Sequence, residues 1–485
     1  MQNYNSKFKI LRKKYPKFIY KNYSYRISKN NLEISFNFEI KPNIFFRPEI
    51  IIENIDKNLS RLSLNKLNNL IFHLGLMEIP SYWKATCSPE IEIKAGALNK
   101  EQINWWKDLI MNGMGQFFYE NKIDFRKPNF LKIKTKPIRV NSTIVKLSLI
   151  NSKKVLVPVG GGKDSVVTLE LLKKAKKNIQ CFSLNPTKAA QKIMKIGGYK
   201  KPIVVRRKID EKLLELNQRG FLNGHTPFSA YLAFLSVLLA VIFDAKFIAF
   251  SNERSSNEGN VKYLGKIINH QWSKSFDFEK KFRNYSKKYL AKDVEYFSFL
   301  RPLYEIQIAK LFSKYPKYFS AFLSCNEAYK TASGTKKPTK KWCGKCPKCL
   351  FTFAILYPFV GKKNPPSRKA TEDKELLKIF GKNLFEDKNL LLIMPQLMED
   401  RGFKPFECVG TKKESLAAFY LSWEKYRELS SVKLPFLLKY FEEKILPKYP
   451  NLKEEAKKIM NLWDKQNNLP KEFEKILKIS PNVLI

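Results

Sequence analysis

The sequence has few histidines and few arginines, and both shortages narrow the range of functions. Among 485 residues there are 3 His and 15 Arg, against 75 Lys, and the formal net charge is +46. A charge of this size is typical of proteins that bind nucleic acids. Arginine, however, is the residue that recognises phosphates and bases in a bidentate manner. The excess of lysine favours a compositional bias together with anionic small substrates, and a nucleic-acid partner is the weaker alternative.

A secretory signal and a membrane-length apolar run are both missing. The segment MQNYNSKFKILRKKYPKF is basic but has no apolar core of the kind that signal peptides carry. The most apolar stretch, 226–243, is short for a bilayer and has a proline in its first turn. A helix buried against a parallel sheet has the same pattern. We expect a cytoplasmic protein without membrane insertion.

Short apolar runs alternate with helix-like segments from Lys154 onward. Four runs have the pattern of strands: 155–159, 179–184, 202–207 and 246–250. Strands separated by helices of this length predict an α/β fold with a doubly wound, Rossmann-like parallel sheet. Ligands of such sheets bind beyond the carboxyl ends of the strands. The candidate binding loops are therefore 160–165, 183–187 and 251–260.

Three domains are expected around this sheet. Residues 1–150 mix strand and helix patterns, including a hairpin near Asn30 and a helix over 104–121, and predict an α+β domain for substrate recognition. Residues 151–362 form the α/β domain. The Pro-rich basic segment 361–374 is typical of a linker. Residues 363–485 predict a mostly helical domain, with Trp423, Phe436 and Trp463 in its core.

The first strand-like run leads into a glycine-rich turn and then a helix. The turn reads Gly160, Gly161, Gly162, Lys163, Asp164, Ser165. Glycines let an anion approach the backbone N–H groups closely, and a helix N-terminus adds positive potential. Lys163 adds a cation, Ser165 a hydroxyl donor and Asp164 a carboxylate that can hold Mg²⁺. The turn predicts a site for the pyrophosphate part of ATP, with a turn that binds no ligand as the alternative.

Two familiar nucleotide motifs fit this turn poorly. The P-loop requires Gly-x-x-x-x-Gly-Lys-Ser/Thr, whereas Asp164 separates Lys163 from Ser165, and the pattern Gly-x-Gly-x-x-Gly is missing. The turn instead resembles the PP-loop of the ATP pyrophosphatase superfamily, Ser-Gly-Gly-x-Asp-Ser. It departs from that pattern by Val159 at the first Ser and by one additional glycine. The resemblance implies a PP-loop sheet and cleavage of ATP to AMP and pyrophosphate.

Further blocks narrow the choice of pyrophosphatase. They are LGLMEIPSYWKATCSP (74–89), WWKDLIMNGMGQFFYEN (105–121), PVGGGKDS (158–165), NGHTPFSAYLAF (223–234), FSNERSSNEGN (250–260), NHQWSKSFDFE (269–279), WCGKCPKCLFTF (342–353) and KPFECVG (404–410). With these blocks, most of the chain resembles the family of UDP-N-acetylmuramoyl-L-alanyl-L-glutamate epimerases.

The resemblance implies an ATP- and Mg²⁺-dependent inversion of the terminal L-glutamate of a nucleotide-linked muramoyl dipeptide, in peptidoglycan precursor synthesis. A proton α to an ionised carboxylate is hard to remove, because a second negative charge would form beside the first. Conversion to an acyl-adenylate removes that charge, so a side-chain base can take the proton.

Residues in the matching blocks are candidates for this chemistry. Asn252, Glu253 and Arg254 follow the last strand-like run. Arg254 has the geometry to hold a carboxylate or phosphate, and the other two to position substrate or metal. A capped turn with a surface ion pair would have the same sequence.

Three further side chains are candidate acids or bases. His225 and His270 are proton carriers near neutral pH, and Cys408 can protonate a carbanion. Each also fits a structural role, as a buried donor or a small apolar side chain. The aromatic runs at 82–84 and 105–106 offer stacking surfaces for a uridine or a sugar, or belong to the core.

Four of the seven cysteines are spaced like metal ligands. Cys343, Cys346 and Cys349 form two C-x2-C steps, and Cys325 lies 18 positions upstream. Such steps bring thiolates within about 4 Å of one another around one ion. The pattern favours structural zinc in a reducing compartment, with an iron–sulfur cluster and plain reduced thiols as alternatives. A similar group accompanies the PP-loop of deazaguanine synthases, which supports zinc by resemblance.

Two other functions are compatible with parts of the sequence. One is a PP-loop synthetase of a deazaguanine or tRNA-modification type, which would suit the charge and the cysteines. The other is a nucleic-acid-binding zinc protein with a vestigial ATP loop. The blocks outside the loop favour the epimerase over the first, and the intact Asp164 and Ser165 favour it over the second.

Overall fold

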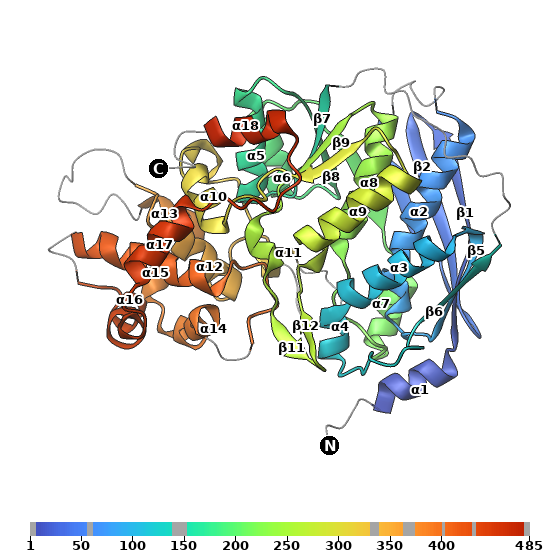
Figure 1. Ribbon diagram of the computed structural model, residues 1–485, viewed down its shortest axis with the longest axis horizontal. Coiled ribbons are helices and arrows are strands. Elements are labelled where there is room, and N and C mark those ends of the chain that lie inside the picture. The colour runs from blue at the N-terminus through green and yellow to red at the C-terminus, as the bar shows by residue number, and fades with distance from the viewer. Residues whose placement is uncertain are drawn as a thin grey trace.

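The computed structural model is an α/β protein with one large mixed sheet and many helices (Figure 1). It describes residues 6–55, 62–137, 153–329, 339–361, 374–399, 403–428 and 433–479. Within these ranges, eleven strands form the main sheet in the order β13-β10-β7-β8-β9-β4-β2-β1-β5-β6, with β3 paired to β2.

Five neighbouring strands of this sheet run parallel. They are β7 (Lys154–Pro158), β8 (Asn178–Leu184), β9 (Ile203–Lys208), β10 (Phe247–Phe250) and β13 (Glu295–Ser298). The helices between them are α5 (Lys163–Lys174), α6 (Lys188–Gly197), α7 (Glu211–Gln218), α8 (Phe228–Ile242) and α9 (Phe276–Tyr289). The four predicted strands are confirmed. Strand β7 lies between β8, the next strand in the chain, and β10, a later one. The loops that follow β7 and β10 therefore leave the sheet next to each other, at the carboxyl ends of the parallel strands.

The prediction of a parallel sheet is wrong for the sheet as a whole, because antiparallel strands from the N-terminal segment extend it. β4 (Glu49–Ile52) pairs antiparallel with β9, and β2 (Asn31–Ile40) pairs antiparallel with β4 and with β1 (Lys17–Ser28). The edge is completed by β3 (Ile44–Phe46), β5 (Glu90–Ala97) and β6 (Lys132–Lys136). The hairpin of β1 and β2 is confirmed, with Lys29 and Asn30 left-handed in its turn.

Side chains of β7 alternate between two hydrophobic cores. Val155 and Val157 lie in the core that contains the apolar face of α5, and Leu156 lies in the core that contains α8. Helix α8 packs on β7 and β10 and on helix α2 (Leu64–Trp83). The prediction that 226–243 holds a buried helix is confirmed. Among the described residues, none of the helices is both long and apolar enough to cross a membrane.

The predicted helix over 104–121 is two helices, α3 (Lys100–Gly113) and α4 (Gly115–Glu120), separated at Met114. Both flanking glycines are sites of close packing. A Cβ on Gly113 would lie 2.8 Å from Pro227 Cβ, and a Cβ on Gly115 would lie 3.2 Å from Ile268 Cγ2. This contact brings the first turn of α4 to the segment that follows Ile268.

The described residues beyond 363 are mostly helical, as predicted. Their main helices are α13 (Lys374–Phe380), α14 (Met394–Met398), α15 (Lys412–Glu428), α16 (Phe436–Tyr440), α17 (Leu452–Asn461) and α18 (Lys471–Ile479). Helices α13 to α17 gather with α12 (Pro347–Leu356) at the left of Figure 1, opposite β1, β2 and β5, whereas α18 lies beside α5 at the top. Two further helices, α10 (Glu305–Phe312) and α11 (Asn326–Tyr329), come earlier in the chain. Trp423, Phe436 and Trp463 are only partly buried and pack against this core from outside. The predicted domain limits near 150 and 362, and most of the predicted linker, lie outside the described residues.

Candidate active site

The predicted ATP loop connects β7 to the N-terminus of α5 at the edge where the parallel strands end. Gly161 has a φ of 103°, and a Cβ there would lie 2.9 Å from Ala189 Cβ, so only glycine fits without strain. A Cβ on Gly160 would meet nothing within 4 Å, which leaves this side of the loop open. Gly162 precedes the helix without a side-chain cap. A loop with an open face and an uncapped helix N-terminus is suited to an anion.

Lys163, the first residue of α5, is buried between two carboxylates. Its Nζ donates to Asp164 Oδ1 at 2.6 Å and to Glu305 Oε2 at 2.8 Å. Burial alone lowers the pKa of Lys163, but these two carboxylates outweigh burial and raise it above its usual value. Lys348 Nζ lies 3.5 Å from the same Glu305 oxygen. Burial alone would raise the pKa of Glu305, yet Lys163 and Lys348 together lower it below its usual range.

Two of the predicted residues that follow β10, Asn252 and Glu253, have buried side chains. Asn252 is buried, and its Nδ2 donates to Ser298 Oγ at 3.1 Å. Glu253 is also buried, and burial, with the negative charges of Glu305 and Asp164 adding to it, raises the pKa of Glu253. Three carboxyl groups therefore influence one another where β7, β10 and α10 meet.

A fully buried arginine holds the backbone of this segment in place. Arg301 Nη1 donates to the Glu253 carbonyl oxygen at 2.6 Å and to Ser256 Oγ at 3.0 Å. Its charge is paired with Glu279, at 3.2 Å between Nη2 and Oε2. This buried ion pair gives Glu253 a rigid support.

Arg254, the third predicted residue of this run, faces another way. It forms an ion pair with Asp464, near the C-terminal end of the described chain, and its guanidinium lies 5.2 Å from the centre of the Tyr304 ring. About a third of its side chain is exposed. The predicted role of Arg254 in binding a carboxylate or phosphate of a ligand stays a prediction, because its guanidinium is paired with the Asp464 carboxylate in this structure.

The three predicted acid–base residues lie together, although they come from distant parts of the chain. The ring centres of His225 and His270 are 4.6 Å apart, and His270 Nε2 is 3.7 Å from Cys408 Sγ. A residue that sequence reasoning missed, Lys274, donates from Nζ to the same sulfur at 3.3 Å. His270 Nδ1 contacts Gln116 Oε1 of α4 at 2.7 Å.

Both imidazoles in this cluster are neutral at neutral pH. Burial, aided by the positive charge of Lys274, lowers the pKa of His270 to about 4. Burial and the neighbouring His270 lower the pKa of His225 well below its usual value. Burial would also lower the pKa of Lys274, but Cys408 and Glu253 raise it above its usual value. The cluster combines a fixed cation with neutral rings and a thiol.

One buried asparagine holds the two loops of the cluster together. Asn260 Oδ1 accepts from the backbone N–H of His270 at 2.8 Å, and its Nδ2 donates to the Pro405 carbonyl oxygen at 2.9 Å. The Lys404 N–H donates to the Asn260 carbonyl oxygen at 2.8 Å. These hydrogen bonds between Asn260 and the backbone therefore fix the segment of His270 next to the segment of Cys408.

Charged side chains link the cluster around His270 to the glycine-rich loop after β7. The negative charges of Glu253 and Glu305 both act on the pKa of Lys274, and Asp164 acts on the pKa of Glu253. Such charges interact over short distances in a buried setting. In addition, Thr168 Oγ1 of α5 lies 2.8 Å from Ser251 Oγ, at the end of β10. The predicted loops at 160–165 and 251–260 therefore meet as expected.

Three charged residues of the site were missed by sequence reasoning: Lys274, Glu305 and Lys348. Lys348 lies inside the cysteine motif and Lys274 inside the block NHQWSKSFDFE, so membership of a distinctive block was a usable signal. Glu305 has no such signal, since its partner Lys163 is 142 positions away.

Most of the aromatic side chains proposed for stacking belong to the core instead. Tyr82, Trp83 and Trp106 are almost fully buried. Trp83 Nε1 donates to the Ser88 carbonyl oxygen, and Trp106 Nε1 donates to Tyr285 Oη. Trp105 is only partly buried and packs against the core, so for this ring the stacking role stays a prediction.

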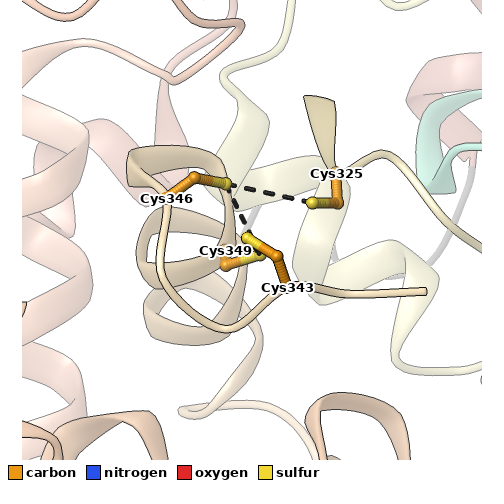
Figure 2. A group of neighbouring side chains, drawn as sticks. All are labelled: Cys325, Cys343, Cys346 and Cys349. Carbon is orange, nitrogen blue, oxygen red and sulfur yellow. Dashed lines mark hydrogen bonds between the residues drawn. The ribbon is translucent and has the colours of Figure 1, made fainter. Parts of the chain in front are cut away.

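The four spaced cysteines converge as predicted (Figure 2). The sulfur atoms of Cys325, Cys343, Cys346 and Cys349 all lie within 4.8 Å of one another. Three of the side chains are buried and Cys343 is half-buried. A set of four thiolates at these distances fits a single soft divalent ion such as zinc.

Comparisons with known proteins cover most of the chain. A family model described as the MurL N-terminal domain matches residues 9–299, and one described as the MurL C-terminal domain matches residues 321–434. A protein of Xanthomonas oryzae pv. oryzae, named UDP-N-acetyl-alpha-D-muramoyl-L-alanyl-L-glutamate epimerase, is 33% identical over 346 residues, which is 71% of this chain and 72% of that protein.

Two further relatives carry the same name. A Micromonospora protein is 33% identical over 346 residues, covering 71% of this chain and 72% of its own. A Salinispora tropica protein is 31% identical over 353 residues, covering 71% of each chain. Identity and coverage of this extent, with both domain models matched in order, confirm the predicted family. The chain belongs to the MurL family of UDP-N-acetyl-alpha-D-muramoyl-L-alanyl-L-glutamate epimerases.

Proposed function

We propose that this protein is an isomerase that inverts the terminal glutamate of UDP-N-acetylmuramoyl-L-alanyl-L-glutamate from L to D, with ATP driving the reaction. The relatives named as epimerases supply the substrate class and place the reaction in peptidoglycan precursor synthesis. The same names disfavour a synthetase of a deazaguanine or tRNA-modification type. A nucleotide-linked substrate and ATP are both consistent with the cytoplasm.

ATP binds at the loop between β7 and α5 in this proposal. The order of the parallel strands, with the loop at their reversal, supports a doubly wound PP-loop fold for this part. The backbone N–H groups of Gly160–Gly162 and the start of α5 face the phosphates, and Lys163 supplies a matching charge. Ser165, whose Oγ now donates to the Gly162 carbonyl oxygen at 2.9 Å, lies in reach of the same anion.

The carboxylates beside the loop are suited to magnesium. Asp164, Glu253 and Glu305 supply the oxygen ligands that Mg²⁺ prefers. The charges of Glu305 and Asp164, which raise the pKa of Glu253, support the proposal, because a divalent cation would reduce the repulsion among these carboxylates. The ion would neutralise charge on the phosphates while pyrophosphate leaves.

Adenylation makes the α-proton of the glutamate removable. The carboxylate oxygen of the substrate attacks the α-phosphorus of ATP, the bond between that phosphorus and pyrophosphate breaks, and an acyl-AMP mixed anhydride forms. The acyl group of this anhydride carries no carboxylate charge, so it no longer repels the negative charge that develops at Cα when the C–H bond breaks. After the proton returns on the other face, water cleaves the anhydride and releases AMP and the inverted carboxylate.

Proton transfer takes place at the cluster of His225, His270, Cys408 and Lys274. Neutral imidazoles accept a proton and a thiol donates one. The charge of Lys274, 3.3 Å from Cys408 Sγ, stabilises negative charge on that sulfur or on the substrate beside it. Gln116 orients the His270 ring through Nδ1.

The observation that carries the proposal is the meeting of a phosphate-type loop and a proton-transfer cluster in one buried site. The experiment combines purified protein, ATP, Mg²⁺ and UDP-N-acetylmuramoyl-L-alanyl-L-glutamate. We expect D-glutamate in the hydrolysed product and pyrophosphate released only when this substrate is present. Inversion at an equal rate without ATP, or pyrophosphate release without inversion, would reject the proposal.

A further inference from the structure

We propose that Cys325, Cys343, Cys346 and Cys349 hold one zinc ion, and that this ion braces the proposed ATP loop by joining the segment that contacts the loop to the segment that carries Lys348. The distances between sulfur atoms are 4.0 Å from Cys325 to Cys346, 3.7 Å from Cys343 to Cys349 and 3.6 Å from Cys346 to Cys349. Four thiolates in a tetrahedron, each about 2.3 Å from zinc, are about 3.8 Å apart. The observed spacing is that of one shared ion.

The alternatives fit this spacing less well. A disulfide requires sulfur atoms about 2.05 Å apart, far closer than any pair here. An iron–sulfur cluster binds each cysteine to an iron at its corner or end, so the cysteines around a four-iron cluster must stand further apart than thiolates that share one ion. The fourth cysteine completes a closed, all-thiolate set, which is typical of a structural site and leaves no position for substrate.

The backbone around the cysteines is shaped for such a site. Gly344 has a φ of 65°, which glycine adopts without strain, and it lets the chain turn between Cys343 and Cys346. The Lys345 N–H points at Cys343 Sγ, at 3.4 Å. Helix α12 begins directly after Cys346, so Cys349 lies in its first turn. Hydrogen bonds of this kind support sulfur ligands that carry charge.

One of the joined segments touches the glycines of the ATP loop. Leu323 N–H, two residues before Cys325, donates to the Gly161 carbonyl oxygen at 2.8 Å. A Cβ on Gly162 would lie 3.7 Å from Ser324 Cβ, so Ser324 is in packing distance of the loop. This segment therefore supports the loop through one hydrogen bond and one packing contact.

The other segment carries a cation and a contact to the acid–base cluster. Lys348 stands between Cys346 and Cys349, and its Nζ is 3.5 Å from Glu305, the partner of Lys163. The Lys348 N–H donates to Glu407 Oε2 at 2.9 Å, next to Cys408. An ion bound by all four cysteines would therefore fix Lys348 and the Gly161 loop relative to each other. Lys348 is a positioning residue for the nucleotide site, which is the part of this inference that rests on the proposed function.

Metal content decides the first half of the inference without any substrate. We expect one zinc per folded chain by elemental analysis, and a cobalt-substituted protein with the strong charge-transfer absorption of four thiolates. Cys343→Ser, at the half-buried ligand, should lose the metal. Cys181→Ala, at a buried cysteine of β8 outside the group, should keep it. Folded wild-type protein without metal, or with iron and cluster absorption, would overturn the assignment.

Nucleotide binding decides the second half. With ATP and Mg²⁺ alone, we expect Cys343→Ser and Lys348→Met each to weaken binding by roughly 10- to 100-fold, and the double variant to be little worse than either. If Cys343→Ser does not fold, Lys348→Met still tests the positioning role. Unchanged affinity in Lys348→Met would overturn the bracing role. Failure of wild-type protein to bind ATP would instead refute the proposed function and leave the zinc assignment standing.

Discussion

The two ends of the proposed active site differ in the charge of their buried groups. At the proposed ATP loop, Lys163 and Glu305 are both ionised, because each is the buried counter-charge of the other. At the other end, burial keeps His225 and His270 neutral beside a thiol. Ionised pairs bind phosphates without exchanging protons, whereas a neutral imidazole can accept a proton from a substrate and a thiol can donate one. The comparison suggests that adenylation and proton transfer are separate tasks of separate residues.

The strongest test of this separation removes the thiol. We expect Cys408→Ser to lower inversion by about 10²- to 10⁴-fold, the usual contribution of an acid or base. Substrate-dependent pyrophosphate release should stay within a few fold of wild type, because Cys408 lies beside Lys274 and not beside the glycines. The two rates are measured on the same samples. Equal losses in both would mean that the two ends are not separate.

A second substitution removes the cation of the other end. Lys163→Met should lower pyrophosphate release by about 10²- to 10³-fold, as for loss of a preorganised charge in the transition state. Inversion should fall in parallel, since it depends on the adenylate. Lys173→Met, on an exposed lysine of the same helix that donates to the Gly197 carbonyl oxygen, serves as the matched control. If Lys163→Met kept the wild-type rate of inversion while pyrophosphate release fell, inversion would not depend on ATP cleavage.

A third histidine shows that a low pKa alone does not mark the site. His73 is buried in α2, contacts the Asn69 carbonyl oxygen and Tyr285 Oη, and has a pKa lowered by burial to about 4. The unfolded chain binds a proton on this group below pH about 6.5, but the folded chain does so only below about 4. Stability should therefore fall as pH drops from 6.5 to 4, by about 1.4 kcal/mol per pH unit for this group.

Urea unfolding across this pH range measures that effect. We expect His73→Gln to have a lower free energy of unfolding at pH 7. Between pH 6.5 and 4, its free energy of unfolding should change less steeply with pH than that of wild type, by the equivalent of about one proton. The folded variant should invert its substrate at neutral pH at a rate close to that of wild type. An unchanged slope would show that His73 is not the group responsible. This histidine thus affects stability, in contrast to His270 in the site.

Local elements could be predicted from the sequence better than pairings between distant segments. The apolar run at 155–159, the glycines and the following helix predicted the ATP loop because all three signals are local. The spacing of Cys343, Cys346 and Cys349 predicted their convergence for the same reason. By contrast, the antiparallel pairing of β4 with β9 joins residues about 155 positions apart, such as Ile50 and Arg207, and no local pattern encodes it.

The candidate site shows the same division. His225, His270 and Cys408 were selected one at a time, and only the fold, through Asn260, shows that they form one cluster. Lys274 was missed because lysines are abundant in this chain, and its place in the block NHQWSKSFDFE was the one local signal that set it apart. Arg254 was selected for its chemistry, but its pairing with Asp464 depends on a segment 210 positions away.

Epimerisation in deuterium oxide tests the central claim most directly, since it follows the α-proton itself. With ATP and Mg²⁺ present, we predict one deuterium at Cα of the inverted glutamate, detected by mass spectrometry of the hydrolysed product. Without ATP there should be neither deuterium nor inversion, and Cys408→Ser should release pyrophosphate while incorporating little deuterium. Deuterium incorporation at the wild-type rate without ATP would contradict the claim that adenylation precedes proton removal.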